Sequence, residues 1–434
     1  MASPHRFVRL KPEKEKSLLR RHPWIFSGAI QEIPSDCAPG ELLPVLANNG
    51  QFLALAYFQP EHSLAGRVLS FSEGPIKEIL KKKIDEALKR REPFYTPETN
   101  AYRLINAEGD ELPGLVVDQY KDVLVMQCTT AGMEHLKNLV VELLLERLRP
   151  KAIYEKSHGP ARLQEGLKEQ EGFIWGDSAD EIEILENGLK FIVSLQEGQK
   201  SGFFLDQREM RHLIRTLSKD KHVLNGFAYT GGFSIAALKG GAAHVDSVEI
   251  SRKVEPTLMK NIALNQCDAM KHRFFGEDVF DFLSPPLKRP LHNAASRGKT
   301  DPIDEQELKG HEMTAFSKED QLCRGRLEKY DLIILDPPAF AKKRSDVEAA
   351  CRGYKQLLGE VFKKARRGTM LLFSSCSHYV DEKLLQMLAF QSAIETGRMV
   401  TLLSRHRQAF DHPISLFHPE GEYLKSLLLS IDGP

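Results

Sequence analysis

Apolar runs of strand length alternate with helical patterns from Asp206 onward, and this alternation restricts the fold more than any other feature of the sequence. The apolar runs lie at 223–225, 244–250, 273–275, 332–335 and 369–373. The helical patterns lie at 207–217, 233–239 and 254–265. Strands that alternate with helices predict a parallel sheet wound on both sides by right-handed crossovers. We therefore assign this part of the chain to the α/β class.

The rest of the chain predicts two further domains, because 434 residues exceed the ~250–300 that one core usually serves. Residues 1–75 hold short apolar runs separated by turn residues, which predicts a small β-rich module. Residues 76–195 begin with a helical pattern over 76–91 and continue as an α+β module. Residues 196–434 then form the α/β domain.

Four segments carry local predictions. Asp206, with Glu209 three residues later, resembles a capping box for the helix that follows. Asn187-Gly188 between two apolar runs is typical of a two-residue hairpin turn. The polar segment 159–172 predicts a surface loop. The long, proline-rich segment 284–326 lacks periodicity, so we expect a mobile insertion between two strands.

Composition excludes several classes of protein. Lys+Arg and Asp+Glu are equal at 60 each, so the net charge identifies no partner. No apolar run reaches the ~20 residues that span a bilayer, and residues 1–10 lack the apolar core of a signal peptide, so we expect a cytoplasmic protein with no membrane partner. The six cysteines are scattered without a CxxC pair or zinc spacing, which predicts free thiols and no metal site.

Basic charge is concentrated between Arg6 and Arg21, where seven Lys/Arg stand against two acids. Arg20 and Arg21, with Trp24 close by, suit phosphate contacts combined with base stacking, so these three residues are candidate RNA contacts. A solvated charged turn explains the same composition equally well. We hypothesise that this stretch and the lysine-rich helix at 77–91 together form a track for RNA.

A glycine-containing motif follows the first strand of the α/β domain and precedes a helix. Its candidate ligand contacts are Asn225, Tyr229, Thr230, Gly231 and Gly232. Ligands of open α/β sheets sit beyond the carboxyl ends of the strands, where glycines permit close backbone approach and a helix N-terminus favours a negative group. The spacing differs from the GxGxxG of dinucleotide folds, and turn glycines without a ligand would look similar.

Three acids near strand or helix ends are further candidates for the same ligand. Glu249 ends the second strand, where a carboxylate can accept hydrogen bonds from both hydroxyls of an adenosine ribose. Asp278 follows the third strand and is placed to meet an adenine amino group, although it could equally be a loop acid. Asp206, at the start of the first helix of the domain, is a third candidate contact for this ligand.

The sequence Asp336-Pro337-Pro338-Ala339-Phe340 follows the buried run 332–335. Two prolines fix a stiff turn without backbone donors, which holds the Asp336 carboxylate at the sheet edge. Such an edge suits a flipped-out base bound through its Watson–Crick side, with Pro337 and Phe340 as candidate RNA contacts.

Cys376 lies in Ser-Ser-Cys-Ser at the end of the next buried run. Carbon 5 of cytosine is too weak a nucleophile to take a methyl group directly, but a thiolate added to carbon 6 makes it reactive. Cysteine suits this role because its thiolate is strongly nucleophilic. Most cysteines are simply small residues of the core. The Asp-Pro-Pro sequence after the preceding strand is what favours a catalytic role for Cys376 together with Asp336.

The chain resembles the RlmI-type family of bacterial 23S rRNA cytosine-5 methyltransferases over nearly its whole length. The resemblance rests on Tyr-Thr-Gly-Gly-Phe, Asp-Pro-Pro-x-Phe and Ser-Cys-Ser and on the segments 17–30, 103–118, 199–208 and 419–425. It implies a PUA domain, a central α+β domain and a Rossmann-like methyltransferase domain whose final strand is antiparallel. It also implies S-adenosylmethionine as cofactor, RNA as partner, Cys376 as nucleophile, and a site lined by Gly231, Glu249, Asp278 and Asp336.

Two departures leave the target nucleotide open. Gly226 stands where the family often has a bulkier residue, and the segment 284–326 separates two motifs of the site. A guanine-modifying RNA methyltransferase is the nearest alternative and would need no cysteine nucleophile. A non-catalytic RNA-binding assembly protein and a nicotinamide-dependent oxidoreductase are more distant alternatives. The oligomeric state, a homodimer included, is left open.

Overall fold

The computed structural model describes residues 6–285 and 324–433, which group into two compact units. The first unit comprises three segments, residues 6–213, 263–266 and 407–424. The second unit comprises residues 214–262, 267–285, 324–406 and 425–433. Nearly all of the predicted insertion lies outside the described residues, and the predicted division into three domains stays a prediction.

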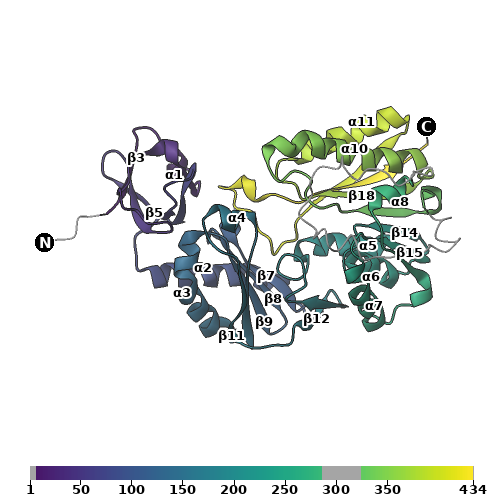
Figure 1. Cartoon of the computed structure of the whole chain (residues 1–434), viewed down its shortest axis with the longest axis horizontal. Coiled ribbons are helices and arrows are strands. Elements are labelled where there is room, and N and C mark those ends of the chain that lie inside the picture. Colours follow the sequence, from purple (N-terminus) through teal and green to yellow (C-terminus); the bar gives the residue numbers. More distant parts are fainter. Residues whose placement is uncertain (1–5, 286–323, 434) are drawn as a thin grey trace. The chain divides into compact units, whose positions relative to one another are not determined.

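The N-terminal part of the first unit is a six-stranded sheet (purple in Figure 1). Its strands are β1 (Val8–Leu10), β2 (Trp24–Phe26), β3 (Ile30–Glu32), β4 (Leu42–Leu46), β5 (Phe52–Phe58) and β6 (Leu64–Ser70), in the order β2-β6-β5-β4-β1-β3. β1 pairs with β4 in parallel, and every other pairing in this sheet is antiparallel. The predicted β-rich module is therefore present, and β1 and the short helix α1 (Lys16–Leu19) lie within its basic stretch.

A five-stranded sheet with two long helices follows in the same unit. Its elements are α2 (Ile76–Arg91), β7 (Ala101–Asn106), β8 (Leu115–Tyr120), β9 (Val123–Cys128), α3 (Ala131–Leu148), β10 (Ala152–Ser157), α4 (Pro160–Gln164) and β11 (Gln170–Gly176), in the strand order β11-β10-β9-β8-β7. The helix predicted over 76–91 is confirmed. The surface loop predicted over 159–172 is wrong, because that segment contains α4 and the beginning of β11.

The predicted hairpin is confirmed by β12 (Glu181–Glu186) and β13 (Leu189–Ser194), which pair antiparallel across Asn187-Gly188. Both turn residues have positive φ, 50° and 78°, as a type I′ turn requires. The capping box predicted at Asp206 is not formed. Asp206 lies inside a 3-10 turn, and its carboxylate binds other partners described below.

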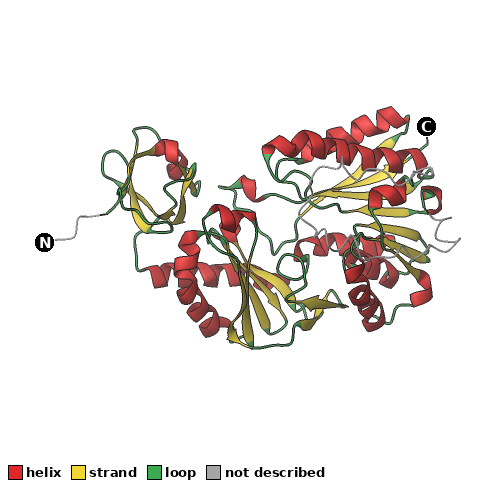
Figure 2. Ribbon diagram, viewed as in Figure 1, coloured by secondary structure: helices red, strands yellow, loops and turns green. Residues whose placement is uncertain are grey.

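The second unit contains a seven-stranded sheet in the order β16-β15-β14-β17-β18-β20-β19. Strands are yellow and helices red in Figure 2. Its strands are β14 (His222–Gly226), β15 (His244–Val248), β16 (His272–Phe275), β17 (Leu332–Leu335), β18 (Thr369–Ser375), β19 (Val400–Arg407) and β20 (Lys425–Ile431). β14 to β18 are parallel, and β20 runs antiparallel to β18. The predicted doubly wound sheet and the antiparallel final strand are thus both present.

Helices cover both faces of this sheet (Figure 1). They are α6 (Gly232–Lys239) and α7 (Glu255–Leu264) on one face, and α10 (Val347–Lys364) and α11 (Glu382–Thr396) on the other. The four residues of β17 are fully buried, as expected for a strand between two helical layers. No helix within residues 6–285 and 324–433 is both long enough and apolar enough to cross a membrane.

Candidate active site

The loop from β14 to α6 concentrates unusual backbone conformations at the carboxyl edge of the sheet. Phe227, Tyr229 and Gly231 have φ values of 61°, 47° and 83°, in the left-handed region. Each such residue with a side chain costs about 1–2 kcal/mol, and strain of this kind is typical of ligand-binding loops. A Cβ at Gly231 would also lie 2.8 Å from Cγ of Leu258, so both conformation and space require glycine here.

Glu249 follows β15 and fixes this loop from the neighbouring strand. Its Oε2 accepts a hydrogen bond from the Tyr229 backbone N–H at 2.9 Å, and its Oε1 accepts one from the Ser251 N–H at 3.1 Å. A carboxylate has about four acceptor positions, so two remain for other donors such as ribose hydroxyls. The side chain is thus held in the place that the sequence predicts, and its contact with a cofactor stays a prediction.

Thr230 carries a buried hydroxyl in the same loop. The residue is 8% exposed, and Oγ1 has no hydrogen-bond partner among the described residues. Its backbone carbonyl is held by the side-chain amide of the fully buried Asn261 at 3.0 Å. A buried hydroxyl without a partner costs about 1–3 kcal/mol, so the loop suits a bound ligand that supplies the missing partner.

Asn225 lies beneath the loop, at the start of a buried hydrogen-bond chain. Its Nδ2 donates to Ser234 Oγ at 2.8 Å, Ser234 bonds Ser247 at 2.7 Å, and Ser247 bonds His272 Nε2 at 2.8 Å. Burial lowers the pKa of His272 to about 4, so the ring is neutral at neutral pH. The chain joins β14, α6, β15 and β16, and Asn225 therefore supports the loop through helix α6.

Asp278 caps the helix α8 (Val279–Leu283), accepting a hydrogen bond from the Phe280 N–H at 2.7 Å. Its carboxylate thus has a structural role beside the predicted adenine contact. Gly226 lies nearby, and a Cβ there would be 2.7 Å from Leu335 and 3.2 Å from Val279. Those neighbours occupy the space that a bulkier residue would need at this position.

Cys376 and Asp336 come together because their strands are adjacent. β17 and β18 pair in parallel with Leu335 opposite Phe373, so Asp336 and Cys376 both follow the carboxyl ends of neighbouring strands. The half-buried Cys376 thiol lies 3.9 Å from the Pro337 carbonyl oxygen, which can accept a hydrogen bond from it. A thiol and a carboxylate at one sheet edge are the two groups that the sequence predicts for catalysis.

Three parts of the chain hold the turn around Cys376: helix α10, the turn after β17, and β20. The buried Tyr354 hydroxyl on α10 bonds Ser375 Oγ and Ser377 Oγ, each at 2.9 Å. Ser377 Oγ also accepts from the Ala341 N–H at 3.2 Å, and the Ser377 carbonyl accepts from Lys425 Nζ at 2.8 Å. Antiparallel pairing between β18 and β20, with Ser375 opposite Lys425, brings Lys425 to this turn, and the sequence alone does not predict that contact.

Pro337 and Phe340, predicted as RNA contacts, both have packing roles. Pro337 is buried, and the half-buried Phe340 ring lies 4.8 Å from the ring of Tyr354 and 6.1 Å from that of Phe280. These contacts stiffen the turn that carries Asp336. A contact between either residue and RNA stays a prediction.

Asp206 belongs to the first unit and is almost fully buried there. Its Oδ2 accepts from Lys200 Nζ at 2.7 Å and from the Tyr423 hydroxyl at 2.6 Å. Burial opposes ionisation, but these two donors and the positive charge of Lys200 keep the pKa of Asp206 below its usual value. The carboxylate is therefore ionised and engaged, and its predicted role in cofactor binding stays a prediction.

The candidate RNA contacts of the first unit differ in availability. Arg20 and Arg21 are exposed and form no ion pair with any other residue that the structure describes. The Trp24 indole N–H donates to Glu108 at 3.1 Å, and its ring lies 4.4 Å from that of His418. Trp24 is thus half-buried and held in place, whereas the two arginines are exposed to solvent.

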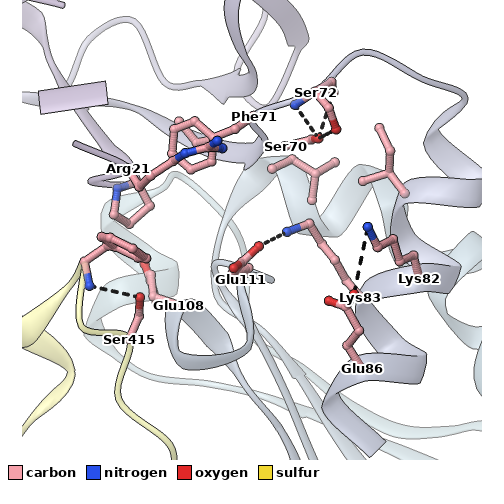
Figure 3. A pocket seen from close by; sticks show the side chains of 15 residues that line it. Arg21, Ser70, Phe71, Ser72, Lys82, Lys83, Glu86, Glu108, Glu111 and Ser415 are labelled. Carbon is pink, nitrogen blue, oxygen red and sulfur yellow. Dashed lines mark hydrogen bonds and ion pairs between the residues drawn. The ribbon is translucent and has the colours of Figure 1, made fainter. Parts of the chain in front are cut away.

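Arg21 also borders a cavity of about 470 Å³ in the first unit (Figure 3). The cavity lies between the end of β6, helix α2 and the segment 407–424. The Arg21 guanidinium is 4.9 Å from the centre of the Phe71 ring. The lining combines cations, acids, serines and two phenylalanines: Arg21, Lys82, Lys83, Glu86, Glu108, Glu111, Ser70, Ser72, Phe71 and Phe417. Its charges largely compensate one another, so it has no strong preference for an anion.

Helix α2 offers less free positive charge than its sequence suggests. Five of its cations pair with acids: Lys77 with Glu142, Lys82 with Glu86, Lys83 with Glu111, and Arg90 and Arg91 with Asp110. Arg91 is fully buried. These pairs weaken the part of the RNA-track hypothesis that rests on α2.

Family models match both units. Residues 8–71 match a PUA-like domain, and residues 111–291 match an S-adenosylmethionine-dependent methyltransferase. A methyltransferase structure from Streptococcus mutans superposes with a TM-score of 0.77 over 98% of this chain and 99% of that chain, at 21% identity. The structure of SMU.776 complexed with SAH gives the same TM-score at 22% identity. The fold and the site thus define a class I S-adenosylmethionine-dependent methyltransferase with a PUA-like domain.

Ribosomal RNA large subunit methyltransferase I of Aliivibrio fischeri is 36% identical over 422 residues, which cover 96% of this chain and 97% of the relative. The protein of the same name from Yersinia pseudotuberculosis is 35% identical over the same length. The chain belongs to the ribosomal RNA large subunit methyltransferase I family. It is an RNA methyltransferase whose cofactor is S-adenosylmethionine.

Proposed function

We propose that this enzyme methylates carbon 5 of a cytosine in 23S rRNA, with Cys376 as the nucleophile. The observation that carries the proposal is the position of the Cys376 thiol, 3.9 Å from the Pro337 carbonyl of the Asp-Pro-Pro turn, at the end of the strand adjacent to the one that Asp336 follows. The names of the relatives place their substrate in the large ribosomal subunit, which supports this choice of RNA. Ribosomal RNA as substrate implies that the reaction takes place in the cytoplasm.

The chemistry requires a covalent bond between enzyme and base. The Cys376 thiolate forms a bond to carbon 6 of the cytosine, and carbon 5 becomes nucleophilic. Bound S-adenosylmethionine would supply the methyl group, its bond from sulfonium sulfur to methyl breaking as carbon 5 is alkylated, and S-adenosylhomocysteine would be the leaving group. A base then removes the carbon 5 proton, the bond between sulfur and carbon 6 breaks, and the aromatic ring is restored.

Asp336 has the position to hold the base during these steps. Its carboxylate follows β17, and the two prolines after it fix the turn. A flipped-out base is recognised by hydrogen bonds to its Watson–Crick edge, which for cytosine includes N3 and the N4 amino group. We assign that contact to Asp336, and we assign the cofactor site to the loop 227–232 with Glu249 and Asp278.

The test is incubation of purified enzyme with unmodified ribosomal RNA and methyl-labelled S-adenosylmethionine, followed by nucleoside analysis. We expect label in 5-methylcytidine, and its loss by at least about a thousandfold in Cys376→Ala because the covalent step disappears. Cys351→Ala is the matched control, because Cys351 is also a half-exposed thiol but lies on α10. Label in a guanosine product, or activity that survives in Cys376→Ala, would contradict the proposed chemistry.

A further inference from the structure

Lys425 is a lysine buried next to the proposed nucleophile. The residue is 3% exposed, and it is the first residue of β20, directly opposite Ser375 in the antiparallel pairing with β18. Its Nζ donates to the carbonyl oxygen of Ser377 at 2.8 Å. Cys376 lies between these two contact residues, so the ammonium group is held against the turn that carries the thiol.

A lysine is seldom buried without a specific role, because removing its charge from water is costly. Here the ammonium lies within a low-dielectric region, where charge acts on neighbours more strongly than in water. A cation beside a cysteine favours its ionised form. Cytosine methylation by a covalent route needs that ionised form before the base is attacked.

We propose that Lys425 is a positioning residue that fixes the Cys376 turn through the Ser377 carbonyl and favours the thiolate form of Cys376 through its positive charge. The relevance of this effect to methyl transfer rests on the proposed function. The effect on the thiol itself does not, because it depends only on the geometry of β18 and β20.

Other titratable groups face the thiol from the elements packed around it. Tyr354 faces it from α10, and burial raises the pKa of this phenol, which therefore stays neutral near pH 7. Asp336 is the carboxyl group on the turn after β17, and its ionised form would oppose ionisation of the thiol. His378 follows on the same turn and is exposed to solvent. Lys425 is thus the buried cation in this set, and we expect its removal to have the largest effect on the thiolate.

The experiment measures the alkylation rate of Cys376 by iodoacetamide between pH 5.5 and 10, using mass spectrometry of the peptide that contains it. Lys425→Gln retains a hydrogen-bond donor for the Ser377 carbonyl but removes the charge. We expect the midpoint of its pH profile to rise by about one unit, which slows alkylation near pH 7 about tenfold. Lys425→Arg retains the charge and should keep a midpoint close to that of the wild type.

Lys221→Gln is the matched control, because Lys221 Nζ also donates to a backbone carbonyl, that of Leu217, at 2.6 Å. Lys221 precedes β14 at the amino edge of the sheet, so its loss should not move the Cys376 profile. Cys351 in the same samples reports whether a variant has unfolded, because unfolding would accelerate its alkylation too. If Lys425→Gln is folded and its Cys376 profile matches that of the wild type, the proposal is overturned.

This test separates the two proposals. Alkylation requires neither RNA nor S-adenosylmethionine, so the pH profile is read independently of the methylation assay. A shifted profile together with methylation that survives in Cys376→Ala would retain the role of Lys425 toward the thiol and reject the covalent mechanism. An unshifted profile together with the loss of 5-methylcytidine in Cys376→Ala would do the reverse.

Discussion

At the scale of single residues, Gly231 shows how the loop 227–232, the proposed cofactor site, depends on its backbone conformation. Its φ of +83° and the 2.8 Å approach of Leu258 to an added Cβ both oppose a side chain. We expect Gly231→Ala to displace the loop and to raise the Kd for S-adenosylmethionine at least about tenfold, which is a loss of ~1.4 kcal/mol. Isothermal titration calorimetry of the purified variant measures this change.

The control for this prediction is Gly397→Ala in the same unit. Gly397 also has positive φ, +66°, but an added Cβ there meets nothing within 4 Å. It ends helix α11, so alanine should cost about 1 kcal/mol of stability and leave cofactor affinity unchanged. Equal affinities for wild type, Gly231→Ala and Gly397→Ala would show that the loop does not bind the cofactor.

At the scale of elements, the buried chain from Asn225 to His272 ties two strands and a helix to the edge strand β16. Burial depresses the pKa of His272 from 6.5 to about 4. Between these two values the unfolded chain binds a proton that the folded chain excludes, so the free energy of unfolding falls as the pH drops. The contribution of this group should fall by about 2 kcal/mol from pH 7 to pH 5.

Urea unfolding at pH 7 and pH 5 measures the effect, comparing wild type with His272→Gln. Glutamine can still bond Ser247 but does not titrate, so the variant should lose less stability on acidification than the wild type. His378→Gln removes an exposed histidine of the same unit and serves as the control. Identical losses in wild type and His272→Gln would contradict the prediction.

The elements that the sequence predicted best are those whose side chains are uniformly apolar. β17 was predicted to the residue because both of its faces are buried under helices, which gives an unbroken apolar run. β10 was missed because it buries Glu155 and Lys156, which look like surface residues in the sequence. In the structure Glu155 pairs with Lys137, and Lys156 Nζ donates to three carbonyls of the loop 195–198.

The candidate site was predictable to the extent that its residues follow parallel strands along the chain. Glu249, Asp336 and Cys376 each come after a buried run, and such positions meet at one edge of a parallel sheet. Tyr354 and Lys425 follow no such rule, because a helix contact and an antiparallel register bring them to Cys376. Pairings of that kind depend on the folded chain and leave no local pattern in the sequence.

At the scale of the whole molecule, we expect the candidate RNA contacts Arg20 and Arg21 to act from the first unit, whereas the residues proposed for methyl transfer lie in the second. Binding and chemistry should then respond to different substitutions. A variant that weakens RNA binding in the first unit should raise KM and leave kcat unchanged, because it removes binding that is equal in the ground state and the transition state.

Arg20 and Arg21 are the cations with which to test this division, because both are exposed and unpaired with any described acid. Each phosphate contact releases counterions, so Arg20→Gln with Arg21→Gln should reduce the slope of log K against log salt by about 1 to 2. Filter binding of ribosomal RNA fragments from 50 to 300 mM salt measures that slope.

The matched control neutralises Lys77 and Arg147, whose charges Glu142 and Asp85 already compensate, and should change the slope little. If both double variants keep the wild-type slope, RNA does not contact the first unit through these arginines, and the basic stretch is a solvated turn.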